Sequence, residues 1–267
     1  MMKDRNYPKI SIITIVYNDV SNIRETIESV LEQTYKNIEY IVIDGGSTDG
    51  TVEIINKFVD KIDFWVSESD GGIYPAMNKG LKFATGDVIN MMNSGDKYNK
   101  KEVVGKVAEF FREKEELSFV LGKSKFVNLD GTDALLGKEE MLTDLEIGRF
   151  TSISHQAFFY KKSLHEDFDL YDLKYKICAD GHFMYKVYQS SKHVGKLVDE
   201  VFAITRQSGI SSSSASILEH KRLYDEVFGR SLLNELLYVK YLLRKSSLGR
   251  LIYNQYLTLK RKFFKGE

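Results

Sequence analysis

Four polar residues in the first hundred positions follow apolar runs, where their carboxylate and amide groups could bind a ligand. They are Asn18, Asp44, Asp70 and Asp96. In open α/β sheets, ligands bind beyond the carboxyl ends of the strands, and each of these residues stands at or just after such an end. The spacing therefore predicts that the four side chains gather at one edge of a sheet.

The segment 44–50 (DGGSTDG) follows an apolar run and precedes a helical pattern. Its small residues, among them Gly45 and Ser47, and the free N–H groups of a helix start would let a nucleotide approach closely. The same segment could be a plain turn with a helix cap, and its composition does not decide between the two. The fingerprints G-x-G-x-x-G and G-x-x-x-x-G-K-[ST] are absent, so neither a dinucleotide-binding dehydrogenase nor a P-loop enzyme is supported.

Asp96 ends the short polar loop Asn93-Ser94-Gly95-Asp96. A carboxylate there can bind Mg²⁺ or Mn²⁺, hard cations that also take diphosphate oxygens and offset the charge on a leaving nucleoside diphosphate. The competing interpretation is a solvated turn. The metal site is favoured because Asp44 and Asp96 would converge on the same sheet edge.

Alternating patterns supply the elements that position these residues. Buried strands are predicted at 10–17, 38–43, 63–67 and 88–92, and helices at 23–31, 52–59 and 73–84. Successive β-α units predict an α/β protein with a mostly parallel, doubly wound sheet. Asn22 followed by Glu25 predicts a capping box at the first helix.

Beyond residue 99 the alternation loosens. The patterns predict a helix at 103–114, a strand at 119–121, a hairpin at Asp130-Gly131, an apolar segment at 157–160, a helix at 180–189 and a strand at 201–205. The serine-rich segment 211–216 (SSSSAS) indicates a flexible joint or lid. A helical pattern begins at Leu218.

Four segments resemble, in order and spacing, the family 2 glycosyltransferases, in particular the bacterial branch that builds surface polysaccharides. They are SIITIVYN, IVIDGGSTDGT, SESDGGIYPAMNKG and ATGDVINMMNSGD, and they lie within residues 10–96. Two later segments, ISHQAFFYKK and KICADGHFMYKV, are similar to the acceptor-side segments of that branch.

The resemblance implies a GT-A (Rossmann-like) fold. It implies a nucleotide-sugar-binding half at 1–99, an acceptor-binding half of the same domain at 100–210 and a helical, basic extension at 211–267. The implied reaction transfers a sugar, hexosyl or N-acetylhexosaminyl, from a nucleoside diphosphate sugar to a hydroxyl with inversion. UDP-sugar is the favoured donor, and Mn²⁺ or Mg²⁺ is the implied cofactor.

Roles for individual residues follow from the same resemblance. Thr14, Tyr17 and Asp44 would line the nucleoside pocket, Asp70 would lie beside the nucleotide, and Asn78 and Lys79 would lie near the donor diphosphate or sugar. The remaining donor-side candidates are Gly45, Ser47, Asn93 and Ser94. Asp96 corresponds to the last acid of the metal-binding triplet of the family, which here is Ser94-Gly95-Asp96 and keeps only that acid.

Asp180 stands where the family has its catalytic base, with Ala179 in place of the usual preceding acid. Such a base takes the proton of the acceptor hydroxyl and contributes roughly 10²–10⁴-fold to the rate. The alternative role for Asp180 is a helix cap. His155 and Gln156 are acceptor-side candidates or a satisfied polar pair at a sheet end, and Cys178 is expected to be a buried structural thiol.

Charge is distributed unevenly along the chain. Basic and acidic residues number 38 each, but residues 238–267 hold eight basic residues against one acidic. The acidic body argues against nucleic-acid binding. The basic tail, with an apolar stripe that includes Leu232 and Leu236, is predicted to lie in an anionic membrane interface, or to pack against the domain or a second copy in a homodimer. Membrane binding would favour a polyprenyl-diphosphate-linked saccharide as the acceptor.

The single cysteine, an N-terminus without an apolar stretch and the lack of an apolar run of about 18 to 20 residues predict a cytoplasmic protein, peripheral on the inner face of the membrane if the tail binds lipid. Two other functions stay open. A non-catalytic nucleotide-binding relative could act as a scaffold. A sugar nucleotidyltransferase is disfavoured because the loop 18–21 (NDVS) lacks glycine and a cation.

Overall fold

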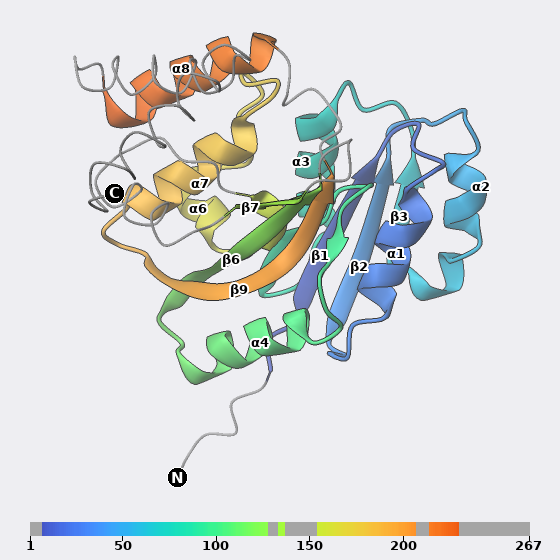
Figure 1. The fold of residues 1–267 in the computed structure, drawn as a ribbon, viewed down its shortest axis with the longest axis horizontal. Coiled ribbons are helices and arrows are strands. Elements are labelled where there is room, and N and C mark those ends of the chain that lie inside the picture. Colours follow the sequence, from blue (N-terminus) through green and yellow to red (C-terminus); the bar gives the residue numbers. More distant parts are fainter. Residues whose placement is uncertain (1–6, 128–132, 137–153, 207–213, 230–267) are drawn as a thin grey trace, which may run out of the picture.

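A computed structural model describes residues 7–127, 133–136, 154–206 and 214–229. Over this part of the chain, the strands form one nine-stranded sheet in the order β3-β2-β1-β4-β8-β6-β9-β5, with β7 paired to β6 (Figure 1). The sheet divides into a parallel N-terminal half and a mixed second half.

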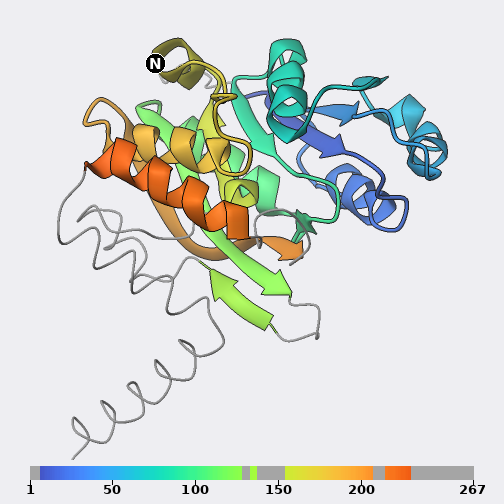
Figure 2. The ribbon, with the colours of Figure 1, turned by 90° about the horizontal axis from the view of Figure 1, so that it is seen from above.

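The N-terminal half alternates strands and helices. Its strands are β1 (Ile10–Val16), β2 (Ile38–Asp44), β3 (Phe64–Ser67) and β4 (Val88–Met91), and its helices are α1 (Ile23–Leu31), α2 (Thr51–Asn56), the short 3₁₀ helix η1 (Val59–Lys61) and α3 (Ile73–Phe83). The four strands pair in parallel, and every residue of β1 and β4 is buried. The helices α1 and α3 cover opposite faces of these strands (Figure 2), which is why most residues of the strands are apolar. The predicted doubly wound arrangement is confirmed.

The second half contains strands of both directions. Its elements are β5 (Lys97–Tyr98), α4 (Val103–Glu113), β6 (Leu117–Val127), β7 (Asp133–Leu136), η2 (His155–Ala157), β8 (Phe158–Lys161), α6 (Leu164–Phe168), α7 (Ala179–Gln189), β9 (Val194–Arg206) and α8 (Ser214–Phe228). The strand β8 runs antiparallel to β4 and β6, whereas β6 and β9 are parallel. The helices α6, α7 and α8 gather above β6 and β9 (Figure 1).

Several predicted boundaries need correction. The strands predicted at 119–121 and 201–205 extend to 117–127 and 194–206, because β6 and β9 pair through register shifts along partly exposed stretches that carry no apolar run. The hairpin is supported by antiparallel pairing of Val127 with Asp133, while its turn lies outside the described residues.

Two local predictions are wrong for a tertiary reason. The Asn22 side chain makes no capping bond at α1 and instead donates to Asp19 Oδ1 (2.6 Å). Glu25, the other half of the expected capping box, pairs with Lys97 and Arg206. At the other end of the chain, α8 already begins at Ser214, so the last three residues of the predicted flexible joint are helical, with α8 packed against α7.

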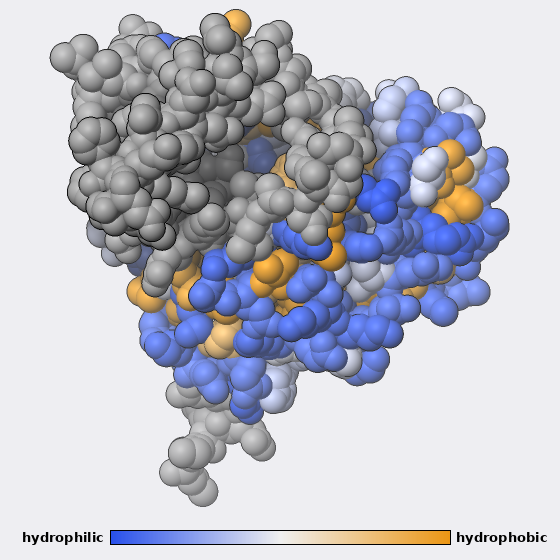
Figure 3. Space-filling model, viewed as in Figure 1, coloured by the Kyte–Doolittle hydropathy of each residue, from blue (hydrophilic) through white to orange (hydrophobic). Residues whose placement is uncertain are grey.

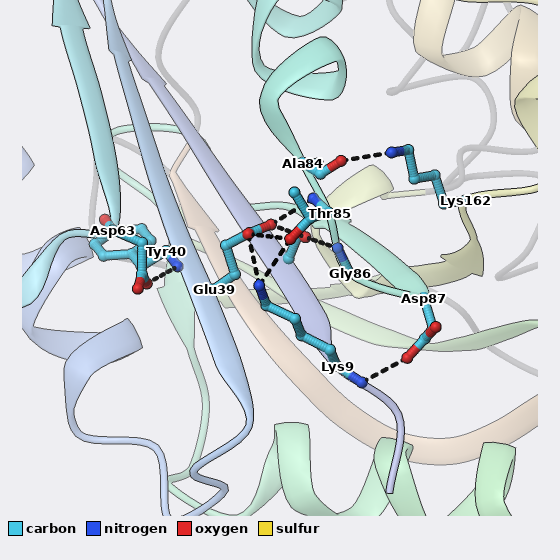
Figure 4. A network of polar contacts seen from close by, with 10 residues as sticks. Lys9, Glu39, Tyr40, Asp63, Ala84, Thr85, Gly86, Asp87 and Lys162 are labelled. Carbon is cyan, nitrogen blue, oxygen red and sulfur yellow. Dashed lines mark hydrogen bonds and ion pairs between the residues drawn. The ribbon is translucent and has the colours of Figure 1, made fainter. Parts of the chain in front are cut away.

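A polar cluster around the buried Glu39 ties together the amino ends of β1 and β2, opposite the predicted binding edge (Figure 4). Glu39 accepts hydrogen bonds from Lys9 Nζ (2.8 Å), Ser11 Oγ (2.5 Å) and the Thr85 backbone N–H (2.7 Å). Burial would raise the pKa of Glu39, but these donors lower it to about 2. This cluster is structural, because it joins the amino ends of the strands, whereas ligands of such sheets bind beyond the carboxyl ends.

The described surface is largely hydrophilic on the face seen in Figure 3, with hydrophobic side chains in small groups. Among the described helices, none has the length and apolar character to cross a membrane. The basic tail, with its predicted apolar stripe, lies in residues 230–267 and so outside the described residues.

Candidate active site

The carboxyl ends of β1, β2 and β4 meet at one edge, as predicted. The Gly45 N–H donates to the Val16 carbonyl (2.9 Å), and the Ser94 N–H donates to the Ile15 carbonyl (3.0 Å). The loops that follow β2 and β4 therefore both lie against the end of β1. All the candidate side chains below come from this edge or from elements that reach it.

Asp44 organises the glycine-rich loop after β2. Its Oδ2 accepts hydrogen bonds from the N–H groups of Gly46 (3.1 Å) and Ser47 (2.9 Å), and Ser67 Oγ donates to the same atom (2.6 Å). Ser47 Oγ donates to Oδ1 (2.5 Å). The carboxylate is fully buried and satisfied. The prediction of a direct nucleoside contact therefore needs correction, because Asp44 shapes the loop from beneath.

Gly45, Asp70 and Tyr17 lie close together beside that loop. A Cβ atom on Gly45 would lie 3.3 Å from Asp70 Oδ2 and 3.4 Å from Tyr17 Cδ2, so this close approach favours a glycine. The Tyr17 side chain is 65% exposed. An exposed ring beside a carboxylate offers a stacking face for a nucleobase and an acceptor for its N–H groups. These three residues fit the predicted nucleotide role.

The turn after β4 carries the triplet Ser94-Gly95-Asp96. Gly95 has a φ of 90°, a left-handed conformation that favours glycine. Ser94 Oγ donates to Asp19 Oδ2 (2.6 Å). Asp19 thus brings a second carboxylate next to a triplet that keeps only one acid of its own.

Asp96 is buried, and no ion pair to it exists within the described residues. The Gln156 side-chain amide donates to its Oδ2, and the Arg206 backbone N–H donates to its Oδ1 (3.2 Å). Burial raises the pKa of Asp96 to about 6, although the His155 charge and these hydrogen bonds oppose the rise. The site therefore contains a buried carboxylate whose charge is only partly compensated, because among the described residues it has hydrogen bonds but no ion pair.

Asp180, in the first turn of α7, contacts two side chains from other elements. Tyr74 OH donates to Asp180 Oδ1 (2.8 Å), and His155 Nδ1 lies 2.6 Å from Asp180 Oδ2. On the far side of the imidazole, His155 Nε2 lies 3.0 Å from Asn93 Nδ2. Asn93, His155, Asp180 and Tyr74 therefore form one connected row across the sheet edge.

The protonation of this row follows from its contacts. Burial would raise the pKa of Asp180, but the hydrogen bond and charge of His155, with the Tyr74 hydrogen bond, lower it below its ordinary value. Burial would lower the pKa of His155, but the bond to Asp180 and the charges of Asp180 and Asp96 raise it. Carboxylate and imidazolium are favoured together.

An imidazolium donates through both ring nitrogens, so His155 Nε2 then needs an acceptor. Asn93 Oδ1 is buried and has no partner among the described residues. Because the oxygen and nitrogen of an amide are assigned from their contacts, exchanging them would bring Oδ1 against Nε2. Asn93 can thus serve as the acceptor of a charged His155.

A divalent cation fits this edge of the sheet if a bound diphosphate and water supply most of the oxygens that coordinate it. Within the described ranges, no group of three or more His, Cys, Asp or Glu is placed to hold a metal ion. Mg²⁺ is commonly held by one or two carboxylates together with substrate phosphates and water. Asp96 offers one buried carboxylate without an ion pair, so it could hold a cation jointly with a diphosphate.

Five predicted residues are brought together by the structure. They are Asn93, Asp96, His155, Gln156 and Asp180. The first two come from the turn after β4, and the others come from η2 and α7, which reach this edge from the second half of the chain. Cys178 is buried with a free thiol, as predicted.

Two predicted donor residues have structural partners instead. Thr14 Oγ1 is fully buried and donates to the Met92 carbonyl (2.8 Å), so it does not line a nucleoside pocket. Asn78 is paired with the backbone of Tyr171, as donor to its carbonyl and acceptor from its N–H (both 2.9 Å). The expectation for Thr14 is therefore corrected, whereas the position of Asn78 near the donor stays a prediction. Lys79 forms an ion pair with Glu68 (3.0 Å), and its contact with a diphosphate stays a prediction.

Three residues at the site were not singled out from the sequence. Tyr74 lies inside SESDGGIYPAMNKG, one of the segments that carry the resemblance, so its position in that segment could have identified it. Asp19 lies in the loop after β1, next to Asn18, which was chosen from the sequence. The backbone of Arg206 carried no signal, because a peptide N–H has no sequence signature.

Comparison with known proteins gives a consistent result. The family model described as "Glycosyl transferase family 2" matches residues 11–191. An uncharacterized glycosyltransferase of Mycobacterium tuberculosis is 34% identical over 184 residues, which cover 66% of this chain and 68% of that protein. A PGL/p-HBAD biosynthesis glycosyltransferase of the same species is 29% identical over 205 residues, covering 76% and 78% of the two chains.

Solved structures share the fold. S. aureus TarS 1-349 in complex with UDP-GlcNAc has a TM-score of 0.66 at 22% identity, covering 89% of this chain and 72% of that one. The mannosyltransferase PcManGT from Pyrobaculum calidifontis, in complex with GDP-Man and Mn²⁺, has a TM-score of 0.63 at 15% identity, covering 89% and 70%. The chain therefore has the GT-A fold and belongs to glycosyl transferase family 2.

Proposed function

We propose that this glycosyltransferase inverts the anomeric configuration as it moves a hexose or N-acetylhexosamine from a UDP-sugar to an acceptor hydroxyl. The observation that carries the proposal is the connected row Asn93-His155-Asp180-Tyr74, which links a donor-side turn to a carboxylate in α7. UDP is favoured because TarS, a fold relative, is described in complex with UDP and with UDP-GlcNAc. GDP-Man in PcManGT keeps guanosine as the alternative.

Asp180 is proposed as the general base. Its lowered pKa keeps it ionised near neutral pH, so it can accept a proton. As the acceptor oxygen attacks the anomeric carbon, the bond from that carbon to the diphosphate oxygen breaks, Asp180 takes the hydroxyl proton and the nucleoside diphosphate leaves. Tyr74 and His155 each occupy one carboxylate oxygen and leave a lone pair on each for the substrate.

Asp96 is proposed to hold Mn²⁺ or Mg²⁺ together with the donor diphosphate. A bound cation stabilises the charge that builds on the leaving group. The chain would hold the ion through the Asp96 carboxylate, which Gln156 and the Arg206 N–H orient. Tyr17, Gly45, Asp70 and Ser47 would form the nucleotide side of the site, and Ser94 and Lys79 would approach the diphosphate.

The acceptor proposal rests on the sequence resemblance and on the name of one relative, which places that relative in PGL/p-HBAD biosynthesis. We propose a lipid-linked saccharide in cell-surface polysaccharide synthesis, with polyprenyl diphosphate as the lipid carrier. Residues 1–99 would bind the donor and 100–210 the acceptor. The basic residues of 238–267 would hold the enzyme at the inner face of the membrane, unless they pair with a second copy.

Ligand binding tests the donor half of this proposal. Thermal unfolding is followed with UDP, GDP, ADP and dTDP, each with and without Mn²⁺, since a ligand at 100 times its dissociation constant adds about 2.7 kcal/mol. The expected result is a Mn²⁺-dependent stabilisation by UDP that is lost in Asp96→Ala. Stabilisation by another nucleotide instead of UDP would assign a different base to the donor. If no nucleotide stabilised the protein, a non-catalytic role would be favoured.

A further inference from the structure

The helix α8 lies beyond residues 11–191, which match the family, yet it contacts the segment that leads into Asp180. Glu219, Leu223 and Glu226 are spaced at i, i+4 and i+7, so they share one face of α8. Leu223 is fully buried, and a Cβ atom on Gly181 of α7 would lie 3.7 Å from Leu223 Cδ1. This face of α8 is therefore packed against the start of α7.

Glu219 binds three successive backbone N–H groups just before α7. Its Oε2 accepts from Lys176 (2.8 Å), and its Oε1 accepts from Ile177 (2.6 Å) and Cys178 (2.9 Å). Cys178 is the N-cap residue of α7 and makes no side-chain capping bond. A single remote carboxylate thus fixes the path of the chain into the helix, where negative charge is favourable.

Asp180 lies two residues after Cys178, in the first turn of α7. Its carboxylate must meet both Tyr74 OH (2.8 Å) and His155 Nδ1 (2.6 Å), and a hydrogen bond weakens steeply when its geometry changes. The position of that first turn therefore decides whether both contacts form. Glu219 is the side chain in the described part of the chain that binds all three N–H groups leading into the turn.

We propose that Glu219 is a positioning residue for Asp180, and that α8 is thereby a working part of the catalytic domain rather than the first helix of a separate tail. The proposal rests on the proposed role of Asp180 as the base. It predicts that loss of the Glu219 carboxylate shifts the start of α7 and loosens the contact between Asp180 and His155, while the donor side, built on β1, β2 and β4, is unaffected.

Glu226 provides a matched control on the same helix face. It accepts hydrogen bonds from Lys174 Nζ (2.7 Å) and Tyr175 OH (2.7 Å), both of which precede the three bound N–H groups. Among the described residues, its one polar contact with α7 is a longer one, 3.4 Å from Oε1 to His182 Nε2, and it binds none of the three N–H groups. Glu226→Gln removes the same charge from the same docking surface. It should lower thermal stability without moving the first turn of α7.

The chain contains a reporter for this turn. Cys178 is its single cysteine and is 1% exposed, so a thiol reagent can react at this place alone and only when it opens. Burial, with the nearby Glu219 charge, raises the pKa of the thiol and slows the reaction further. Because Glu219 also acts on the thiol pKa directly, the rate is divided by the thiolate fraction, taken from the pH dependence of labelling in each variant. This corrected labelling rate of Cys178 measures how firmly the start of α7 is held.

The experiment compares full-length wild type, Glu219→Gln, Glu219→Ala, Glu219→Asp and Glu226→Gln. A disulfide reagent measures Cys178 labelling, and NMR of the histidine side chains, assigned with His155→Asn, measures the His155 pKa. In Glu219→Ala we expect labelling at least tenfold faster and a His155 pKa that falls toward 6.5, with partial recovery in Glu219→Asp. Glu226→Gln should stay within twofold of wild type in labelling rate and should keep its His155 pKa.

Two outcomes would overturn the proposal. The first is a folded Glu219→Ala or Glu219→Gln protein with wild-type labelling and His155 pKa. The second is an equal change in Glu226→Gln, which would mean that α8 only stabilises the fold. Neither the labelling rate nor the His155 pKa depends on the donor, so this test is separate from the test of the base by Asp180→Asn. Unchanged turnover in Asp180→Asn would show that Asp180 is not the base. The effect of Glu219 on the start of α7 would still have been measured.

Discussion

The hydroxyl of Tyr74 lies 2.8 Å from Oδ1 of Asp180, although 106 residues separate the two along the chain. Tyr74 belongs to the start of α3, directly after the loop that contains Asp70, whereas Asp180 belongs to the start of α7. This one hydrogen bond joins the nucleotide side of the sheet edge to the proposed base. The segments proposed for the donor side and the acceptor side therefore meet at the proposed site of sugar transfer.

Replacing Tyr74 with phenylalanine should lower kcat about 10- to 100-fold, because a hydrogen bond to a charged group contributes about 1.5 to 3 kcal/mol. Donor KM should change little, since the hydroxyl faces Asp180 and not the nucleotide loop. Steady-state turnover with a UDP-sugar measures both constants. Tyr171→Phe is the matched control, because Tyr171 is also buried and its hydroxyl contacts Tyr160 (3.3 Å). Equal losses in the two variants would argue against a specific role for Tyr74.

The contact between Tyr74 and Asp180 illustrates what the sequence could predict. Strands, helices and the gathering of Asp44 and Asp96 at one edge followed from apolar runs and from the rule that parallel strands end together. Asp180 and His155 came from the resemblance, because no local sequence pattern predicts that their segments reach this edge. The family motifs thus identified candidate residues of the site, and the sheet topology explains why these residues lie close together.

Thr14 and Asn78 show what motifs leave undetermined. Both belong to segments that resemble donor-binding motifs, but their partners are Met92 and Tyr171, which lie 78 and 93 residues away in the sequence. A motif does not say which of its polar residues face a ligand and which satisfy buried backbone groups. That choice depends on tertiary contacts, as does the role of Asp44 beneath its own loop.

The binding of a nucleoside diphosphate with Mn²⁺ should weaken below about pH 6. Burial raises the pKa of Asp96 from 3.8 to about 6, so the carboxylate that would hold the cation is protonated below that pH. A protonated carboxyl is a poor ligand, and affinity should fall up to about tenfold per pH unit. Thermal stabilisation by UDP with Mn²⁺ at pH 5 and at pH 7 measures the effect.

In the ligand-free protein, the stability of the fold should change with pH in the opposite direction. Because the pKa of Asp96 is higher in the folded than in the unfolded chain, protonation stabilises the fold as the pH falls through about 6 toward 3.8. The variant Asp96→Asn should lose both pH dependences. If UDP with Mn²⁺ stabilises this variant equally at pH 5 and 7 and as strongly as wild type, Asp96 does not hold the metal.

Glu39→Gln should lower the free energy of unfolding by about 3 kcal/mol near neutral pH. The pKa of Glu39 falls from 4.5 to about 2 on folding, and each unit corresponds to about 1.4 kcal/mol. For a lowered pKa this stability is complete above 4.5 and is lost as the pH falls toward 2. Urea unfolding across that range measures it, and Glu102→Gln, at an exposed position, should change stability by no more than about 0.5 kcal/mol. A Glu39→Gln protein with wild-type stability at pH 7 would show that the cluster in Figure 4 contributes little.

Asp180→Asn tests the proposed base most directly. The amide keeps the size of the side chain and can still accept from Tyr74, but it cannot take a proton, so turnover should fall about 10²- to 10⁴-fold. Binding of UDP with Mn²⁺ should persist, because Tyr17, Gly45 and Asp70 belong to other elements of the sheet edge. Turnover and nucleotide-induced stabilisation are measured on the same preparation. Retained turnover would mean that another group takes the proton. Loss of both turnover and nucleotide binding would mean that the substitution has disturbed the edge as a whole. Asp180→Glu then serves as a second test, because it restores a carboxylate one carbon farther out. It should recover nucleotide binding more fully than turnover.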